Sequence, residues 1–146
     1  MELTTIDACQ IAGIPRQRFN EYVAAGDYPC APATVMGKAR RFTVNDTVCL
    51  YLFAREIEGR TKAINAGMIA GAVHRALNDN PNAAACTLAK LSDGRPIALV
   101  PADTSISDQF DGAWIVSLTT INLAAVRKVV EAQATEDTEA GELVAE

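Results

Sequence analysis

A glycine and a proline in close succession divide the start of this chain into two segments of helical character. Gly13 ends the first segment, and Pro15 opens the second, which stops at Gly26. Glycine is common just after a helix, and proline is favoured at the first helical position because its missing N–H has no partner there. The sequence therefore predicts two helices joined by a tight turn, with the length and punctuation of a helix-turn-helix unit.

The side-chain pattern of these segments separates a buried face from an exposed one. Thr4 or Thr5 can cap the first helix, which is expected to run to about Ala12. In the second helix, apolar residues recur at the spacing of an inward face, and these are Phe19, Tyr22 and Val23. The side chains left on the outer face are Arg16, Gln17, Asn20 and Glu21, with Arg18 at the margin.

A basic segment follows the second helix. Residues 27–37 contain prolines and have no helical periodicity, whereas Lys38–Phe42 alternates in the manner of a short strand. We expect a wing here, formed by two strands that are joined around residues 36–38.

Two longer helices are predicted next. Thr43 and Asp46 form a capping pattern for a helix that ends at about Glu58. Thr61 is expected to cap a further helix over residues 62–78. Two of its residues either weaken this helix or allow close packing, and these are Gly67 and Gly71.

A polar run at residues 78–82 coincides with a change of charge along the chain. Nine basic and seven acidic residues lie in 1–77, whereas four basic and eleven acidic residues follow. Only the first part therefore favours a polyanionic partner. We place one domain at residues 1–78 and a second domain after the polar run.

The second domain is predicted to contain a small antiparallel sheet. Asp93-Gly94 can form the tight turn of a hairpin between strands over 87–92 and 95–100, because glycine readily adopts positive φ. Pro96 indicates an edge strand or a strand that starts after it. A third strand is expected over residues 114–118.

A helix over residues 122–133 is expected to cover this sheet. The second domain then spans residues 83–134, and it is the candidate for self-association. Residues 135–146 lack an apolar stripe and are predicted to be a disordered acidic tail. The expected fold class is α+β.

The order of motifs in the first domain resembles the MerR-type winged helix, a DNA-binding domain of bacterial and phage regulators and of excisionase-like proteins. The residues that carry the resemblance are Thr5-Ile6, Arg18-Phe19-Asn20-Glu21, Gly26, Lys38–Phe42 and Asn45-Asp46. The chain departs from the family at Asn20, where a second aromatic residue is usual, and it lacks the long heptad helix of the family's usual dimer. The family's effector or metal-sensing role is therefore not implied.

Double-stranded DNA is the partner that these residues predict. Arg16, Gln17 and Asn20 suit base edges in a major groove, because arginine pairs with guanine and amides pair with adenine. The resemblance places Arg18 on the DNA surface, at a phosphate. The side chains expected on the DNA backbone or in the minor groove are those of the wing, Lys38, Arg40 and Arg41.

Other interpretations of these charges remain open. The arginines can instead form an ordinary solvated surface. Arg55, Arg60 and Lys62 can reach phosphates from the helix pair or can equally form surface ion pairs with Glu56 or Glu58. Of these, Arg60 and Lys62 are secondary DNA candidates.

Other site classes find little support in the sequence. The four scattered cysteines and the single histidine, His74, predict neither disulfides nor a metal site. No cofactor, catalytic residue or small-molecule effector is expected. A chain without a membrane-length apolar run or a secretory signal is expected in the cytoplasm.

The sequence as a whole predicts a sequence-specific DNA-binding transcriptional regulator, not an enzyme. A homodimer that represses from an inverted-repeat operator is expected, with self-association through the C-terminal half. The alternatives are a protein-interaction adaptor, an excisionase-like architectural protein, and an enzyme or redox sensor that uses a cysteine.

Overall fold

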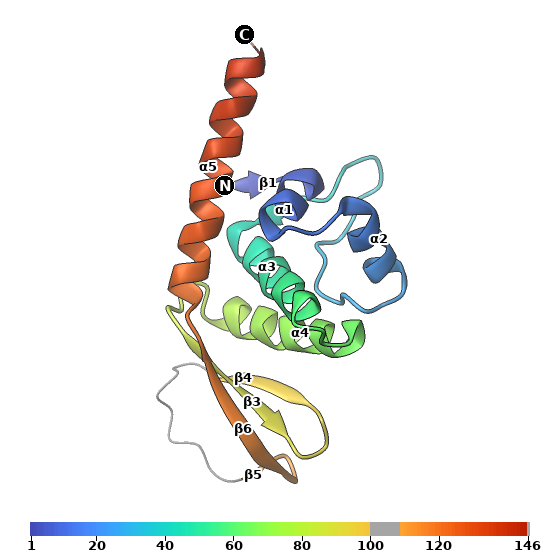
Figure 1. The fold of residues 1–146 in the computed structure, drawn as a ribbon, viewed down its shortest axis with the longest axis vertical. Coiled ribbons are helices and arrows are strands. Elements are labelled where there is room, and N and C mark those ends of the chain that lie inside the picture. Colours follow the sequence, from blue (N-terminus) through green and yellow to red (C-terminus); the bar gives the residue numbers. More distant parts are fainter. Residues whose placement is uncertain (100–108, 146) are drawn as a thin grey trace.

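The computed structural model describes residues 1–99 and 109–145, with side chains through residue 136. Over these residues the chain is α+β, with five helices and two antiparallel sheets. Figure 1 shows the helices α1 to α4 grouped above the larger sheet, with α5 rising along one side.

The first two helices end where the sequence predicts. Helix α1 (Thr5–Ala12) is capped by Thr4, whose Oγ1 accepts a hydrogen bond from the Asp7 amide at 3.1 Å. Gly13 ends α1 in the left-handed conformation, with φ of 76°. Helix α2 (Arg16–Ala24) begins one residue later than predicted, because Pro15 is the extended N-cap residue and not the first helical residue. The tight turn between two short helices is confirmed.

The expected wing is only partly formed. Val35 and Lys38 make a single β-bridge around Met36-Gly37, and Lys38–Arg41 do not continue as a strand. Instead β2 (Phe42–Thr43) pairs antiparallel with β1 (Glu2–Leu3). The N-terminus therefore supplies the hydrogen-bonding partner that was expected from within the wing.

Helices α3 (Val44–Glu58) and α4 (Ala63–Asp79) form an antiparallel pair. The predicted capping box of α3 is present, with Thr43 and Asp46 bonded to one another's backbone amides. The predicted cap of α4 is wrong. The Thr61 hydroxyl is turned back toward α3 and lies 2.7 Å from Glu56 Oε2.

The larger sheet has the strand order β4-β3-β6-β5. The predicted hairpin is formed by β3 (Cys86–Leu91) and β4 (Pro96–Leu99), and β4 is an edge strand, as Pro96 indicates. Residue 100, the expected end of that strand, lies outside the described residues. Strand β6 (Ala113–Ile121) pairs with β3, and the short β5 (Gln109–Phe110) pairs with the start of β6.

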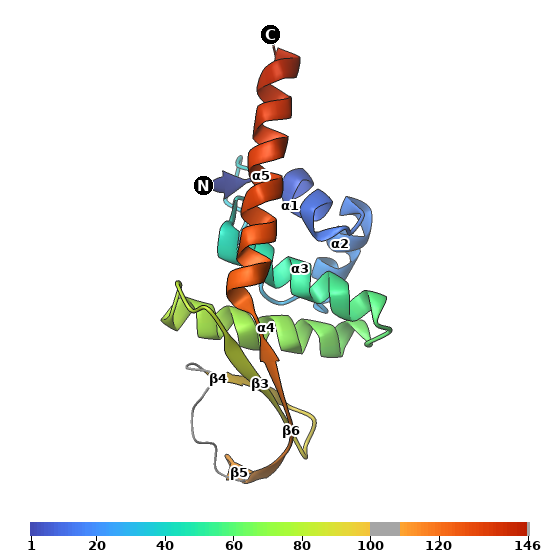
Figure 2. The ribbon, with the colours of Figure 1, turned by 60° about the vertical axis from the view of Figure 1, so that its left-hand side comes forward.

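The covering helix of this sheet differs from the expected one. Helix α4 packs on β4 and β3, with Ile69 and Ala72 of α4 against Leu88. Figures 1 and 2 show α4 lying across the end of the sheet, between the sheet and the other helices. The two parts expected as separate domains are therefore in contact through α4.

Helix α5 (Leu123–Ala145) packs on α3 and α1 instead of on the sheet. Its buried residues Leu123, Val130 and Ala134 join the same apolar core as Phe19, Phe42 and Phe53. The helix also continues through residues 135–145, where a disordered tail was expected. The Thr135 hydroxyl donates a hydrogen bond to the Glu131 carbonyl at 2.9 Å, within the helix and across the expected boundary.

None of the helices in the described part of the chain is long and apolar enough to span a membrane. This finding agrees with the apolar runs in the sequence, all of which are short.

Candidate nucleic-acid interface

The outer face of α2 presents the polar side chains that the sequence analysis singled out. Arg16, Gln17 and Asn20 are all exposed. Together with Glu21 and Ala24 they line a shallow hollow of about 540 Å³. An open hollow along a helix that carries arginine and amide groups can receive a polar edge of a large partner.

This face is held outward by the aromatic packing beneath it. Phe19 is fully buried, and its ring lies 5.8 Å from the rings of both Tyr28 and Phe42. Tyr22 packs edge-on against Phe53 of α3 at 5.2 Å. Because the buried residues set the rotation of α2, Arg16, Gln17 and Asn20 must face away from the core.

Arg18 occupies the margin of the face, as predicted, and it already has partners. Its guanidinium lies 3.3 Å from Glu21 Oε2 and 3.2 Å from the Tyr22 hydroxyl. The Arg18 side chain is still 59% exposed, so this pair contributes little to stability and can exchange for another anion. The i, i+3 spacing of Arg18 and Glu21 is the sequence signal for this pair.

The wing segment contains one arginine that is exposed to solvent and one that is bonded within the protein. Lys38 and Arg41 are exposed, and the Lys38 amide bonds to the Val35 carbonyl at 2.8 Å. Arg40 is half-buried, and its guanidinium donates a hydrogen bond to the carbonyl of Pro32. Arg40 therefore braces the loop, and of the three predicted wing contacts only Lys38 and Arg41 project fully into solvent.

The turn between α3 and α4 adds two further exposed cations, Arg60 and Lys62. Arg60 adopts a positive φ of 68°, although Gly59 precedes it. Two hydrogen bonds hold this shape, from the Arg60 amide to the Ile57 carbonyl and from the Thr61 amide to the Glu56 carbonyl, each 3.0 Å long. A non-glycine residue costs about 1 kcal/mol or more in this conformation, so the position favours glycine on backbone grounds alone.

Arg55 belongs to the scaffold beneath this face. Its Nη2 donates to the Ala12 carbonyl at 2.8 Å and pairs with Glu58 at 2.9 Å. The bond to Ala12 satisfies a carbonyl at the end of α1, where the helix itself offers no donor. The sequence left Arg55 as either a phosphate contact or a partner in an ion pair, and the structure shows the ion pair.

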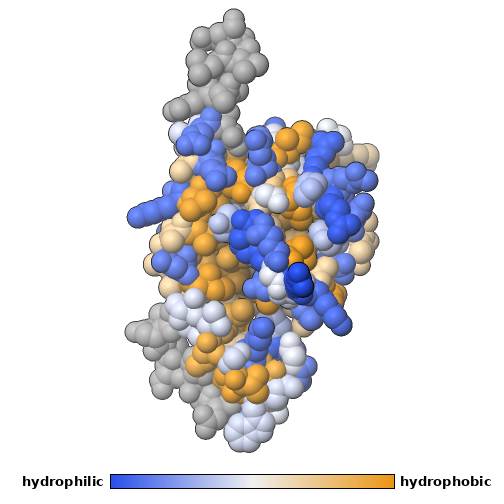
Figure 3. All heavy atoms as spheres, in the orientation of Figure 1, coloured by the Kyte–Doolittle hydropathy of each residue, from blue (hydrophilic) through white to orange (hydrophobic). Residues whose placement is uncertain are grey.

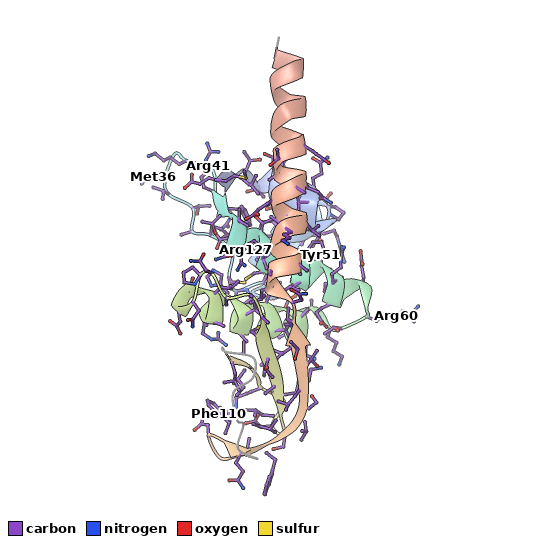
Figure 4. All side chains as sticks on the ribbon, turned by 90° about the vertical axis from the view of Figure 1, so that its left-hand side faces the viewer. Met36, Arg41, Tyr51, Arg60, Phe110 and Arg127 are labelled. Atoms are coloured by element: carbon purple, nitrogen blue, oxygen red, sulfur yellow. The ribbon has the colours of Figure 1, made fainter. Side chains whose placement is uncertain are left out.

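The three basic segments lie on one side of the molecule. In Figure 1 the wing loop, α2 and the α3–α4 turn are all on the right, and α5 runs along the left. In Figure 4, seen from the α5 side, Arg41 and Arg60 project beyond opposite edges of the body. Helix α2 therefore has exposed cations on both flanks.

His74 lies at a different place, where the loop after α2 meets α4. Its Nε2 is 3.2 Å from Asp46 Oδ1, beside a hollow of about 460 Å³ that Cys30 and Arg75 also line. Burial would raise the pKa of Asp46, but hydrogen bonds from His74 and from Thr43 hold that pKa below its ordinary value. In the part of the chain that the structure describes, no group of three metal-ligating side chains gathers here or elsewhere.

The cysteine thiols are poorly suited to nucleophilic chemistry. Burial raises the pKa of Cys9 to about 11, and burial also raises the pKa of Cys30, Cys49 and Cys86. The reactive form of a cysteine is the thiolate, which is scarce at neutral pH when the pKa is raised. The four thiols are therefore poor nucleophiles at neutral pH.

The basic side combines a helix that presents arginine and amide groups with cationic segments on each of its flanks. No protein-family model matches the chain, and a search of curated proteins found no relative.

Proposed function

We propose that the N-terminal part is a winged helix-turn-helix that binds double-stranded DNA, and that the chain is a sequence-specific transcriptional regulator. The observation that carries the proposal is the arrangement of Arg16, Gln17 and Asn20 on one exposed helix face, between the exposed cations of two flanking segments. A single α-helix fits the major groove, and flanking loops then reach the backbone on either side.

The chemistry of the α2 face suits the reading of base edges. Arginine can bind guanine with two hydrogen bonds, and the amides of Gln17 and Asn20 can do the same with adenine. Glu21 lies in the same hollow and would repel phosphates. A surface that binds the phosphate backbone carries cations alone. A face that combines arginine, amides and a glutamate therefore favours base edges over the backbone.

The flanking segments have the composition that phosphates require. Lys38 and Arg41 on one flank and Arg60 and Lys62 on the other are exposed. Residues 1–77 carry a net charge of +2, and the remainder carries −7, so DNA is attracted to one part and repelled by the other. This asymmetry would orient the protein as it approaches a duplex.

A homodimer on an inverted repeat is the proposed assembly. One such unit contacts few base pairs, and two units related by a two-fold axis read two half-sites with greater affinity. A bound dimer at a promoter would exclude other proteins, so repression is the proposed outcome.

The test begins with selection of preferred duplexes from a random library by the purified full-length chain. Binding to the selected duplex is then measured by fluorescence anisotropy over a range of salt concentrations. The logarithm of affinity should fall linearly with the logarithm of salt concentration, by about 0.9 for each neutralised phosphate. A duplex with one half-site should bind more weakly than the inverted repeat.

Single substitutions distinguish the residues proposed to read bases from the residue proposed to contact the DNA backbone. Asn20→Ala and Arg16→Ala should change base preference by about 1–3 kcal/mol, whereas Arg18→Ala should weaken binding to all duplexes. Lys128→Ala removes an exposed cation from α5, on the other side of the molecule, and should change nothing. Equal losses from all four substitutions would contradict the assigned roles.

The absence of salt-dependent affinity for any duplex would overturn the proposal and favour an adaptor that binds another protein. The exposed apolar side chains of the larger sheet, which include Trp114 and Phe110, are the observation that favours this second candidate.

A further inference from the structure

The tip of the wing, residues 35–38, exposes apolar side chains instead of covering them. Met36 is 99% exposed, the highest value for any large apolar side chain among the described residues, and Val35 beside it is 62% exposed. Apolar side chains stabilise a fold by leaving water, so a methionine that stays in water contributes little to folding. The wing tip therefore has apolar surface that a partner can cover.

This tip is narrow and has a defined shape. Val35 and Lys38 form a β-bridge, in which the Lys38 amide donates to the Val35 carbonyl at 2.8 Å. Gly37 has a φ of 78°, and of the two residues at the apex only Met36 carries a side chain. The minor groove of B-DNA is about 6 Å wide, so an apex with one unbranched side chain can enter it.

The base of the wing is fixed against α2. Phe19 of α2 lies 5.8 Å from Tyr28, where the loop begins, and 5.8 Å from Phe42, where it ends. All three rings are buried. The Arg40 guanidinium donates to the Pro32 carbonyl across the loop. A side chain that separates stacked bases needs support from behind, and these contacts supply it.

The charges around the tip favour a polyanion as its partner. Residues 28–45 include three cations and no acidic residue. Figure 4 shows Met36 and Arg41 at the same edge of the body, and Figure 3 shows hydrophilic atoms gathered over the neighbouring α2. Proteins that lie on a lipid surface bury a long apolar helix face or a lipid chain, a larger area than Met36 and Val35 provide. DNA is therefore favoured over an anionic membrane.

We propose that Met36 inserts between two stacked base pairs from the minor groove, next to the major groove that α2 would occupy, and kinks the duplex there. Proteins that bind the minor groove frequently insert an apolar side chain, methionine included, and bend DNA by about 20–90°. Lys38 and Arg41 then lie near the phosphates that border the groove. This inference rests on the proposed function and adds a second means of recognising sequence.

The second means is the ease with which a base step opens. Pyrimidine–purine steps, which are TA and CA/TG, unstack and kink more easily than other steps, whereas runs of adenine are stiff. The preferred duplex should therefore contain a pyrimidine–purine step beside the base pairs that α2 contacts. No hydrogen bond to a base is needed at that step.

The test uses the full-length chain and the duplex that it selects from a random library. Energy transfer between dyes at the two ends of the duplex measures the bend. A fluorescent adenine analogue, whose emission rises when stacking is lost, is placed at each adenine in turn. The native chain should bend the duplex and unstack one pyrimidine–purine step in each bound half-site.

Two substitutions at the tip separate insertion from simple proximity. Met36→Gln keeps the length of the side chain but makes it polar, so most of the bend and the rise in emission should be lost. The salt dependence of binding should not change, because the cations remain. Met36→Leu is the matched control and should keep the bend. Met36 is fully exposed, so both variants should have the circular dichroism of the native chain.

A change in the DNA provides an independent test. Replacing the unstacked step by AA should weaken binding of the native chain about tenfold. The same replacement should leave the affinity of Met36→Gln almost unchanged, because that variant no longer opens the step. Equal losses for the two proteins would mean that another group recognises the step, and would overturn the inference.

The outcomes distinguish this inference from the proposed function. A chain that binds no duplex contradicts the proposed function and the insertion of Met36 together. Tight binding to a selected duplex that stays straight and stacked, or a bend that Met36→Gln retains, would overturn the insertion alone. A straight bound duplex, together with binding to phosphatidylserine vesicles that Met36→Gln loses, would assign the tip to a membrane surface instead.

Discussion

Arg127 of α5 and Asn45 of α3, which are 82 positions apart, are joined by a hydrogen bond of 3.3 Å from Arg127 Nε to Asn45 Oδ1. Arg127 Nη2 also donates to the carbonyls of Pro81 and Ala83, at 3.2 and 3.1 Å. The Asn45 amide reaches the same Pro81 carbonyl at 3.0 Å. These bonds connect α5, α3 and the turn after α4, so they join the two parts of the chain.

Arg127→Ala should therefore lower the free energy of unfolding by about 1–3 kcal/mol, because hydrogen bonds from a charged donor are lost at a half-buried site. Urea unfolding followed by circular dichroism measures the change. The neighbouring Lys128→Ala is the control and should change stability by less than about 0.5 kcal/mol. An unchanged Arg127→Ala variant would mean that the Arg127 hydrogen bonds do not contribute to the position of α5.

Arg60→Gly should separate stability from DNA affinity. Glycine adopts the positive φ of this position without strain, so the free energy of unfolding should rise by up to about 1 kcal/mol. The greater conformational entropy of glycine in the unfolded chain reduces this gain. The same substitution removes a cation, and affinity for the selected duplex should fall. Arg60→Ala is the matched variant, with the same loss of affinity and no gain in stability.

Gly67→Ala and Gly71→Ala should have opposite effects on stability. A Cβ at Gly67 would overlap the carbonyl of Asp27, so the loop after α2 must move, at a cost of about 2 kcal/mol or more. A Cβ at Gly71 would meet Pro29 and Arg75 at 3.6 Å, an ordinary contact. Gly71→Ala should therefore gain up to about 1 kcal/mol from helix propensity. Thermal unfolding of both variants tests the pair.

Arg40→Ala and Arg41→Ala should differ although the residues are adjacent. Arg41 is exposed, so its loss should weaken DNA binding and reduce the salt slope by about 1, without affecting stability. Arg40 is bonded to the Pro32 carbonyl, so its loss should lower thermal stability. If Arg40→Ala reduced the salt slope as much as Arg41→Ala, Arg40 would be a phosphate contact after all.

Asp46 should contribute a pH-dependent part of the stability. Its pKa in the folded chain lies below the ordinary value of 3.8, so folding favours the ionised form. This contribution is present above the ordinary pKa and is lost as pH falls through the folded pKa. Asp46→Asn should be less stable than the native chain at neutral pH, and the difference should shrink below about pH 4. Asp79→Asn, at an exposed site on α4, is the control for acid titration of unfolding.

The sequence by itself determined the features that depend on near neighbours. Gly13 ends α1, Thr43 and Asp46 cap α3, and Asp93-Gly94 forms the hairpin turn, because each of these needs only the residues a few positions away. The outer face of α2 was likewise predictable, since helical periodicity and the buried Phe19 set its rotation.

Only the tertiary structure decided which elements meet. An apolar stripe shows that a helix is covered but does not identify its partner, so α4 on the sheet and α5 on α3 could not be assigned in advance. The same reason separates Arg40 from Arg41, pairs β2 with β1, and places the positive φ at Arg60. These outcomes depend on contacts between residues far apart in the chain, and no local pattern encodes such contacts.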